Sequence, residues 1–575
     1  MRWRRSLALA VLAALVLAAC TGIPDDGPVT TARGDDGQAR TTVRYSPAGP
    51  RVGASPEEIV RGYLDAMLAY PVTTATASEF LTPGAARSWR ASRRTVVYGA
   101  HEVSQVSARP DEVDRTQDGT GAIVRLTAST RAVLGPTGRY GRGDDLDERL
   151  RLVKVKGQWR ITDPPSGTLV SSRFFDDYYR AFDVFFFDRP GQRLVPRVVH
   201  LPIGGQLPTA LVAALAAGPD DDRFLRTYVP SRSSLRPSVP VADRVADVAF
   251  TVELGGRTAG DLDRLAAQVV WTLRQVPDLD GVRITGGSPV LSPNGEPVND
   301  LSDWGRFGPS GGSPVAYALA GDRLRQVDGD SAEPVDGPWG RDAAGASRVA
   351  VGDRDAAGIV DQGGAVRVQG LQGGTVRRLP AVAASALTWD GQRMLWVADR
   401  PGGTRLRVGP PARLRTLEVP GLDQVVVTSL AVSPDGGHVV VTGRRDGRTE
   451  LLLAPVARDR AGEVTRVGDL RRLAPSVSTV RSGGWLDASV VELLGTTRLG
   501  LQVRRVSIDG SGLTSGVAGG VSLLPDVGPR LLARGSAVDP PRWVLDDRGR
   551  LWHQPPGDTW RVLRTRDVVD LSTSP

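Results

Sequence analysis

Hydrophobic and polar positions change their pattern several times along the 575 residues of this chain. Behind three arginines, the stretch from Leu7 to Leu17 is continuously apolar for about a dozen residues, which is too short to span a bilayer but suits a signal peptide. We therefore expect residues 1–19 to be a signal peptide. Residues 20–52 are polar, rich in Gly, Asp, Pro, Thr and Arg, and lack apolar periodicity, so they predict a flexible tether.

Helical and strand-like patterns follow the tether and predict an α+β domain over residues 53–173. The segment Ser55-Pro56-Glu57-Glu58 has the form of a capping box, and apolar residues from Ile59 to Leu68 recur at helical spacing. A second short helix is expected over Ala85–Arg93. Strands are expected over Thr95–Tyr98, Gly121–Ser129 and Leu150–Ile161, the last with a turn at Lys156-Gly157. The stretch "LRLVKVKGQWRIT" resembles the final hairpin of an NTF2-like or cystatin-like domain, in which a helix packs on a curved sheet.

Eight aromatic residues are concentrated between positions 174 and 187. They are Phe174, Phe175, Tyr178, Tyr179, Phe182, Phe185, Phe186 and Phe187. Such a cluster could form a ligand-binding or membrane-facing surface. We favour a helix that passes into a buried strand, with the rings in a domain core or interdomain contact, because the run ends directly in the turn Asp188-Arg189-Pro190-Gly191.

Alternating strand and helix patterns predict a second α+β domain over residues 174–310. The helices are expected over Pro208–Ala217, stopped by Gly218-Pro219, and over a stretch that begins near Ala259 and extends to Leu273. The strands are expected over Leu194–Leu201, Val245–Leu254, Val282–Thr285 and Val290-Leu291, the last before a Pro293-Asn294-Gly295 turn.

From residue 311 to 575 helical periodicity disappears and short apolar strands alternate with Gly, Asp and Pro turns. Weakly self-similar segments begin at Ser385, Thr428, Arg481 and Pro541, with fainter relatives near Pro314 and Ser347. Trp389 and Val432 are 43 residues apart, and Val432 and Trp485 are 53 apart. This spacing favours a β-propeller of five to seven blades, with six as our estimate, over a pair of β-sandwiches.

The net charge and the cysteine content exclude several kinds of partner and site. The formal charge is +8, of which three positive charges belong to Arg2, Arg4 and Arg5, and the rest of the chain mixes arginine with acidic residues. This balance predicts a solvated surface and no nucleic-acid partner. Cys20 is the only cysteine, so intrachain disulfides, cysteine-based zinc sites and thiol catalysis are excluded.

Residue types that carry catalysis show no recognisable arrangement. The four histidines, His101, His200, His438 and His553, have no partner at metal-ligand spacing, and we expect neither a metal site nor a cofactor. We interpret His438 as a solvent-facing strand residue and His553 as a blade-surface residue. The acidic runs Asp144-Asp145 and Asp220-Asp221-Asp222 are interpreted as solvated loops. No nucleophile elbow or phosphate loop is present, and we predict no catalytic residue and no enzyme.

The place of Cys20 gives the sharpest site prediction. It follows the apolar run as Leu17-Ala18-Ala19-Cys20, which resembles the lipobox of bacterial lipoproteins. That resemblance implies cleavage before Cys20, a diacylglyceryl group on its thiol and an acyl group, such as palmitate, on the new amine. Two lipid groups anchor a protein stably to a membrane, whereas a single acyl chain does not. The alternative is a chance cysteine in an ordinary secretory signal, or a thiol buried in a core.

The order of the parts completes a family resemblance. The stretches "FFFDRPGQRLVPRVVHLP", "PTALVAALAAGP" and "LAAQVVWTLRQVPDLDGVRI" are similar to the GerMN-type domain of the LpqB family of actinobacterial lipoproteins, and the C-terminal part resembles that family's propeller. The resemblance covers essentially the whole chain after the signal. It rests on diffuse, mostly structural motifs, so it indicates a family more than a site.

The resemblance implies a lipoprotein on the extracytoplasmic face of the cell membrane that acts as a non-enzymatic accessory of the MtrAB two-component system. Its expected partner is the extracytoplasmic sensor region of an MtrB-like kinase, with a role in envelope homeostasis and division. Two alternatives stay open. One is a propeller hydrolase of the envelope, which would need an opposed carboxylate pair. The other is a binding protein for a cell-wall fragment, which would need a deep pocket with convergent polar groups.

Overall fold

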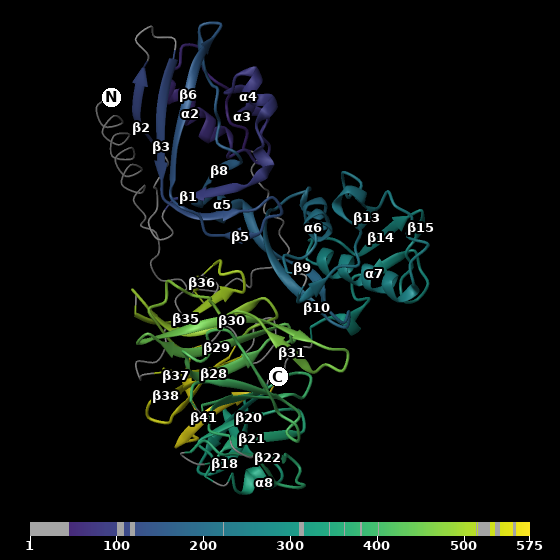
Figure 1. The fold of residues 1–575 in the computed structure, drawn as a ribbon, viewed down its shortest axis with the longest axis vertical. Helices are drawn as coiled ribbons and strands as arrows, with labels where there is room; N and C mark the ends of the chain where they lie inside the picture. Colours follow the sequence, from purple (N-terminus) through teal and green to yellow (C-terminus); the bar gives the residue numbers. More distant parts are fainter. Residues whose placement is uncertain are drawn as a thin grey trace, which may run out of the picture. The chain divides into compact units, whose positions relative to one another are not determined.

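The computed structural model describes most of the chain from residue 45 onward. The described residues are 45–99, 109–115, 121–221, 223–309, 315–343, 345–360, 363–379, 382–400, 402–498, 500–512, 514–515, 529–534, 541–555 and 559–574. Within these residues, the N-terminal half contains both helices and sheets, and the C-terminal half is almost entirely strands (Figure 1). The expected α+β and all-β regions are thus confirmed, while the NTF2-like or cystatin-like architecture stays a prediction.

The first region contains two four-stranded sheets and four α-helices. The sheets have the orders β5-β4-β1-β8 and β2-β3-β6-β7, and β1 and β8 run parallel. Its helices are α2 (Pro56–Ala66), α3 (Ala75–Glu79), α4 (Pro83–Ser88) and α5 (Ser172–Tyr178). Its strands are β1 (Thr95–Tyr98), β2 (Arg109–Arg115), β3 (Gly121–Ala128), β4 (Thr130–Leu134), β5 (Tyr140–Gly141), β6 (Leu146–Val155), β7 (Gln158–Ile161) and β8 (Thr168–Ser171).

Helix α2 begins as the sequence predicts. The Ser55 side chain accepts from the Glu58 amide, and the Glu58 carboxylate accepts from the Ser55 amide at 2.8 Å, which completes the capping box. The helix buries its apolar face, including Ile59 and Tyr63, in a core shared with β3 and β6. The β6–β7 turn also matches its prediction, because Lys156 (φ 52°) and Gly157 (φ 77°) adopt the left-handed conformations of a tight hairpin.

One expectation for this region is wrong in detail. The helix expected over Ala85–Arg93 is α4, which begins at Pro83 behind a Thr82 cap and ends at Ser88. Trp89 is extended because its indole donates to carbonyls of the β7–β8 connection, a contact between residues distant in sequence. The β6–β7 hairpin is the last hairpin of the first region within the described residues, because β8, which follows it, pairs in parallel with β1.

The second region packs two helices against two small sheets. Its sheets have the orders β10-β9-β11 and β12-β13-β14-β15, with β16 also paired to β14. Its helices are α6 (Leu207–Ala216) and α7 (Ala259–Leu273). Its strands are β9 (Tyr179–Asp188), β10 (Leu194–Pro202), β11 (Leu225–Arg226), β12 (Val241–Ala242), β13 (Val245–Ala249), β14 (Gly281–Gly286), β15 (Ser288–Pro289) and β16 (Val298–Asp300).

The aromatic run forms the expected helix and buried strand. Helix α5 passes directly into β9, and Phe185, Phe186 and Phe187 are buried in the core of the second region. The strand expected over Val245–Leu254 is shorter and ends at Ala249, and Val290 lies just beyond the two-residue strand β15.

Helix α7 covers an open edge of β9 with polar side chains. β11 pairs with only the last two residues of β9, which leaves earlier backbone groups of that strand without a neighbouring strand. Gln268 donates to the Phe185 carbonyl at 2.9 Å, and the Thr272 hydroxyl accepts from the Phe185 amide at 3.2 Å. These two residues lie at helical spacing on the buried face of α7, so the helix satisfies an edge that would otherwise be exposed.

The third region consists of six sheets that follow one another in sequence order. The first strands of successive sheets lie against each other, and the C-terminal β41 joins β17, β18 and β19 in the first sheet. A four-residue helix, α8 (Pro338–Arg341), lies between β19 and β20.

The strands of the third region are β17 (Ala316–Ala320), β18 (Arg323–Asp328), β19 (Ser331–Pro334), β20 (Arg348–Val351), β21 (Asp355–Ile359), β22 (Val366–Gly370), β23 (Arg377–Arg378), β24 (Ala384–Trp389), β25 (Leu395–Asp399), β26 (Arg405–Gly409), β27 (Arg415–Leu417), β28 (Val426–Val432), β29 (His438–Arg445), β30 (Arg448–Arg458), β31 (Val464–Val467), β32 (Arg471–Arg472), β33 (Thr479–Trp485), β34 (Val490–Thr497), β35 (Gly500–Ser507), β36 (Thr514–Ser515), β37 (Pro529–Arg534), β38 (Arg542–Asp546), β39 (Leu551–Gln554), β40 (Arg561–Val562) and β41 (Val568–Thr573).

The self-similar segments do not all occupy the same place in their sheets. Those from Ser385, Thr428 and Arg481 form the first two strands of a sheet, whereas the one from Pro541 forms β38 and β39, the second and third. Their likeness has a local cause. Asp390 and Asp546 each accept from two backbone amides of the following turn and from the indole of the tryptophan six positions on.

Candidate functional site

Strand β10 carries polar contacts that join the second region to the third. It is the edge strand of its sheet. Arg197 donates from Nη1 to Nε2 of His438, at the start of β29, over 2.9 Å. His200 places Nε2 3.0 Å from Oδ2 of Asp509 and 3.0 Å from Oγ of Ser511, both in the turn after β35. A short strand therefore meets two consecutive sheets of the third region through side chains.

The same strand also reaches the first region. The His200 amide donates to the Gly138 carbonyl at 2.7 Å, and the imidazole packs beside the rings of Tyr140 and Phe175, with centroids 5.6 and 5.7 Å away. His200 is thus a point where all three regions touch.

Asp183 on β9 makes a further contact with the third region. Its carboxylate accepts from the Ser489 hydroxyl at 3.0 Å. Its backbone is held from the other side by Gln275, whose amide group accepts from the Asp183 N–H at 2.8 Å and donates to its carbonyl at 2.6 Å. The aspartate is therefore positioned by its own region and presented to a neighbouring one.

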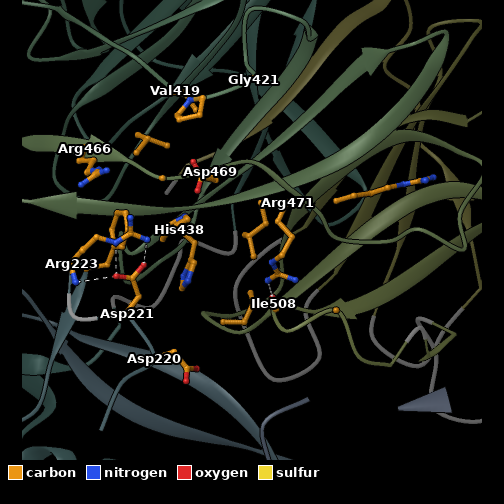
Figure 2. A pocket seen from close by; sticks show the side chains of 18 of the residues that line it. Asp220, Asp221, Arg223, Val419, Gly421, His438, Arg466, Asp469, Arg471 and Ile508 are labelled. Carbon is orange, nitrogen blue, oxygen red and sulfur yellow. Dashed lines mark hydrogen bonds and ion pairs between the residues drawn. The ribbon is translucent and has the colours of Figure 1, made fainter. Parts of the chain in front are cut away.

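A cavity of about 1500 Å³ lies where these contacts meet. Figure 2 shows His438 with the ion pair of Asp221 and Arg223 on one side and Arg471 on the other. Arginines line the cavity from all three regions. They are Arg139, Arg142, Arg197, Arg223, Arg405, Arg466, Arg471 and Arg472.

Arg197 is half-buried among these cations. Burial lowers its pKa to about 10, the charge of Asp435 opposes this shift, and the charges of Arg139 and Arg471 add to it. No carboxylate of a described residue lies within ion-pair distance of Arg197, which instead bonds only the imidazole of His438 and the carbonyl of Pro196. At neutral pH this is a charged guanidinium without an ion-pair partner, surrounded by charges of both signs.

The contact with Arg197 also determines the tautomer of His438. A guanidinium can only donate, so Nε2 of His438 accepts and the proton of the neutral ring is on Nδ1. Burial, reinforced by the charges of Arg197 and Arg471, holds the pKa of His438 well below its ordinary value. Nδ1 is buried and has no hydrogen-bond partner among the described residues. His438 is thus a neutral imidazole with an unused donor.

Buried carboxylates beside the cavity differ in the direction of their pKa shifts. Burial and the nearby charge of Asp487 raise the pKa of Asp183 to about 7, and burial raises that of Asp435 to about 6. Burial acts in the same direction on Asp509, but hydrogen bonds from His200 and Ser511 outweigh it and leave the pKa of Asp509 below its usual value.

Two interpretations of histidines are wrong. His438 is only 3% exposed, because β10 of another region covers the start of β29. His553 is also buried, stacked on Trp543 with ring planes 16° apart and bonded through Nδ1 to Asp330 at 3.0 Å. Both errors have one cause, since alternation along a strand cannot reveal what another part of the chain places over it.

The predicted lipidation site falls outside the described residues. Cys20 and the lipobox residues Leu17, Ala18 and Ala19 lie before residue 45, and His101 lies in a gap. Among the described residues, no helix is long and apolar enough to cross a membrane. Within the same ranges no group of three or more potential ligands is arranged to hold a metal ion.

Sequence reasoning missed Arg197, Arg471 and Asp183 as site residues. A signal did exist for two of them. Arg197 interrupts the otherwise apolar stretch of β10, and Asp183 stands inside the aromatic run of β9, so each is a charge in a strand expected to be buried. Arg471 has no such signal, because it belongs to a two-residue strand among other arginines.

Comparisons with known proteins cover nearly the whole described chain. A family model for the N-terminal domain of lipoprotein LpqB matches residues 49–176, one described as "Sporulation and spore germination" matches 183–289, and one for the LpqB beta-propeller domain matches 322–568. Lipoprotein LpqB of Thermobifida fusca is 30% identical, with 87% of this chain and 88% of the relative covered. That of Streptomyces coelicolor is 28% identical, with 88% and 89% covered. Among solved structures, a nidogen/laminin complex aligns with 45% of this chain and 97% of its own at 12% identity and a TM-score of 0.32, which is too low to indicate a function.

Proposed function

Because this chain belongs to the LpqB family of lipoproteins, we propose that it is a membrane-anchored, non-enzymatic accessory of an MtrB-like sensor kinase on the extracytoplasmic face of the cell membrane. The observation that carries the proposal is the family relationship, which extends over all three regions. The relatives are named for an anchor and not for a reaction.

The proposed anchor is a lipid on Cys20, the only cysteine of the chain. A diacylglyceryl thioether and an N-acyl group would hold the protein at the outer leaflet, and residues 20–52 would tether the folded part. A flexible chain of that length has a root-mean-square span of roughly 30 Å. Such a tether keeps binding surfaces within reach of membrane partners and raises their effective concentration.

We further propose that the six sheets of the third region are the blades of one propeller. In that arrangement β41 and β17 would bring the two ends of the region together in one blade. Pairing of the first and last strands in one sheet supports this architecture, which presents loops from several blades to a partner.

The arrangement of charged groups supports a binding role. The buried carboxylates Asp390, Asp546 and Glu492 each accept from an arginine of the same region. Groups engaged in this way hold the fold together, and arginines from all three regions line the cavity between them, where they could contact a ligand or partner.

Reconstitution of the kinase would test the proposal. The full-length MtrB-like kinase of the same organism would be placed in proteoliposomes, and its autophosphorylation rate measured with and without the lipidated protein. We expect the rate to change on addition and a crosslink to form between the protein and the extracytoplasmic part of the kinase. An unchanged rate together with no crosslink above that of an unrelated lipoprotein would contradict the proposal.

The matched control is Cys20→Ala. This variant should be found outside the membrane fraction or with its signal uncleaved, and purified without its lipid it should need a higher concentration to affect the kinase. Mass spectrometry of the mature N-terminus would test the anchor directly. A processed, lipid-modified Cys20→Ala protein would contradict lipidation at this residue.

A further inference from the structure

The strongest unassigned feature is the cavity of about 1500 Å³ where the three regions meet. Its cations come from separate parts of the chain. Arg142 follows β5, Arg197 lies on β10 and Arg471 begins β32. Residues from three regions at one cavity indicate a site assembled by the tertiary structure.

Within the described residues these three cations have no ion-pair partner, although carboxylates such as Asp221, Asp469 and Asp509 also line the cavity. Neither Arg142 nor Arg197 forms an ion pair with a described residue, and Arg471 donates to the carbonyl of Ile508. Arg471 lowers the pKa of Arg197 and Arg142 lowers that of Arg471, while the charges of Asp435 and Asp509 act in the opposite direction on Arg197 and Arg471. Arg197 is half-buried, whereas Arg142 and Arg471 are exposed. A desolvated charge without an ion-pair partner is costly, so we expect an external anion to bind at Arg197.

Arg197 has the donors that such an anion would need. Both of its hydrogen bonds use Nη1, which leaves Nε and Nη2 without a partner among the described residues. Nη1 of Arg197 donates to the neutral ring of His438, so the planar guanidinium is held in place before any ligand binds. A preorganised guanidinium is suited to bidentate binding of phosphate or carboxylate.

We propose that this cavity binds a small polyanion, a molecule with two or more phosphate or carboxylate groups, between the guanidinium groups of Arg142, Arg197 and Arg471. The volume exceeds that of one phosphate and suits a ligand the size of a phosphorylated or acidic saccharide. The ligand would screen the repulsion among the arginines and link the first and second regions to the third. This site does not depend on the kinase being the partner.

Calorimetric titration of the detergent-solubilised full chain, in a buffer free of phosphate, would test the site with pyrophosphate, citrate, glucose 1-phosphate and inorganic phosphate. Pyrophosphate and citrate should bind saturably and more tightly than inorganic phosphate, and added sodium chloride should weaken them. Stronger binding of glucose 1-phosphate than of inorganic phosphate would identify a sugar-linked source for the phosphate. The assignment is overturned if none of the four probes binds saturably.

Variants would locate the binding. Arg197→Met should weaken pyrophosphate about ten- to a hundredfold, because it removes a charge-assisted pair of hydrogen bonds. Arg142→Met offers an exposed second variant that leaves the core untouched and should also weaken binding. The matched control is Arg413→Met, an exposed arginine paired with Glu463 and not among the residues that line the cavity.

Equal affinity in the parent, Arg197→Met and Arg142→Met would place the anion elsewhere and overturn the proposal. A hexaglutamate peptide that binds more tightly than pyrophosphate, with the same dependence on Arg197, would also overturn it, because the occupant would then be an acidic protein segment.

Discussion

Two arginines, the buried Arg458 of the third region and the half-buried Arg197 of the second, are held in opposite ways. Arg458, at the end of β30, donates to the Gly436 and Gly462 carbonyls and, over 2.7 Å, to Asp390. Arg197 on β10 has no carboxylate partner among the described residues. Arg458 donates only to groups within the protein, whereas Arg197 lines a cavity with donors that have no partner among the described residues. The difference separates a cation that maintains the fold from one available for binding.

The largest effect is expected from Arg458→Met. Loss of this guanidinium leaves the Asp390 carboxylate, which is 2% exposed, without its charged partner. Breaking a buried pair in this way typically destabilises a protein by about 3–5 kcal/mol. Urea unfolding followed by tryptophan fluorescence would measure the loss. Arg413→Met, which breaks the exposed pair with Glu463, is the control and should cost no more than about 1 kcal/mol. Equal losses in both variants would contradict the distinction between buried and exposed pairs.

A smaller, pH-dependent effect is expected from Asp183→Asn. The pKa of Asp183 is raised to about 7 in the folded protein, so between pH 4 and 7, roughly, the folded chain binds this proton more tightly than the unfolded chain. Stability contributed by this residue therefore falls as pH rises through that window and stays low above it. Asparagine, which cannot ionise, should raise the free energy of unfolding at pH 8 by at least ~1 kcal/mol and leave it unchanged near pH 4.

The control for this pH dependence is Asp147→Asn, because the pair with Arg125 lowers the pKa of Asp147. Compared with the parent, Asp147→Asn should be less stable above the pKa that this carboxyl has in the unfolded chain and equally stable at low pH. This change in stability is opposite in sign to that expected for Asp183→Asn. Unfolding curves at both pH values would compare the two. If Asp183→Asn differed from the parent by the same free energy of unfolding at pH 4 and at pH 8, the raised pKa of Asp183 would be contradicted.

The smallest effect on stability is expected from Arg197→Met in a phosphate-free buffer. Methionine loses the hydrogen bond to His438 but also removes a desolvated charge that forms no ion pair with a described carboxylate, so the two changes largely cancel. The free energy of unfolding should stay within about 1 kcal/mol of the parent. A loss as large as that of Arg458→Met would show that Arg197 is a structural cation.

Much of the fold could be predicted from sequence because its signals are local. The capping box at Ser55, the tight turn at Lys156-Gly157 and the passage from helix to strand near Tyr179 each depend on neighbouring residues, and each is confirmed. The family resemblance drawn from the order of the parts is also confirmed. Predictions failed where a distant contact decides, as at Trp89, whose indole is held by the connection after β7.

The site could be predicted much less well, because its residues are brought together by the tertiary structure. The sequence by itself determined the apolar segment from Leu7 to Leu17, the single Cys20, the family and the alternation of helices and strands. Only the tertiary structure placed β10 over the start of β29, buried His438 beneath Arg197, and gathered arginines from three regions around one cavity. Periodicity reports which face of an element is apolar, whereas the burial of a charge depends on which other element packs against it.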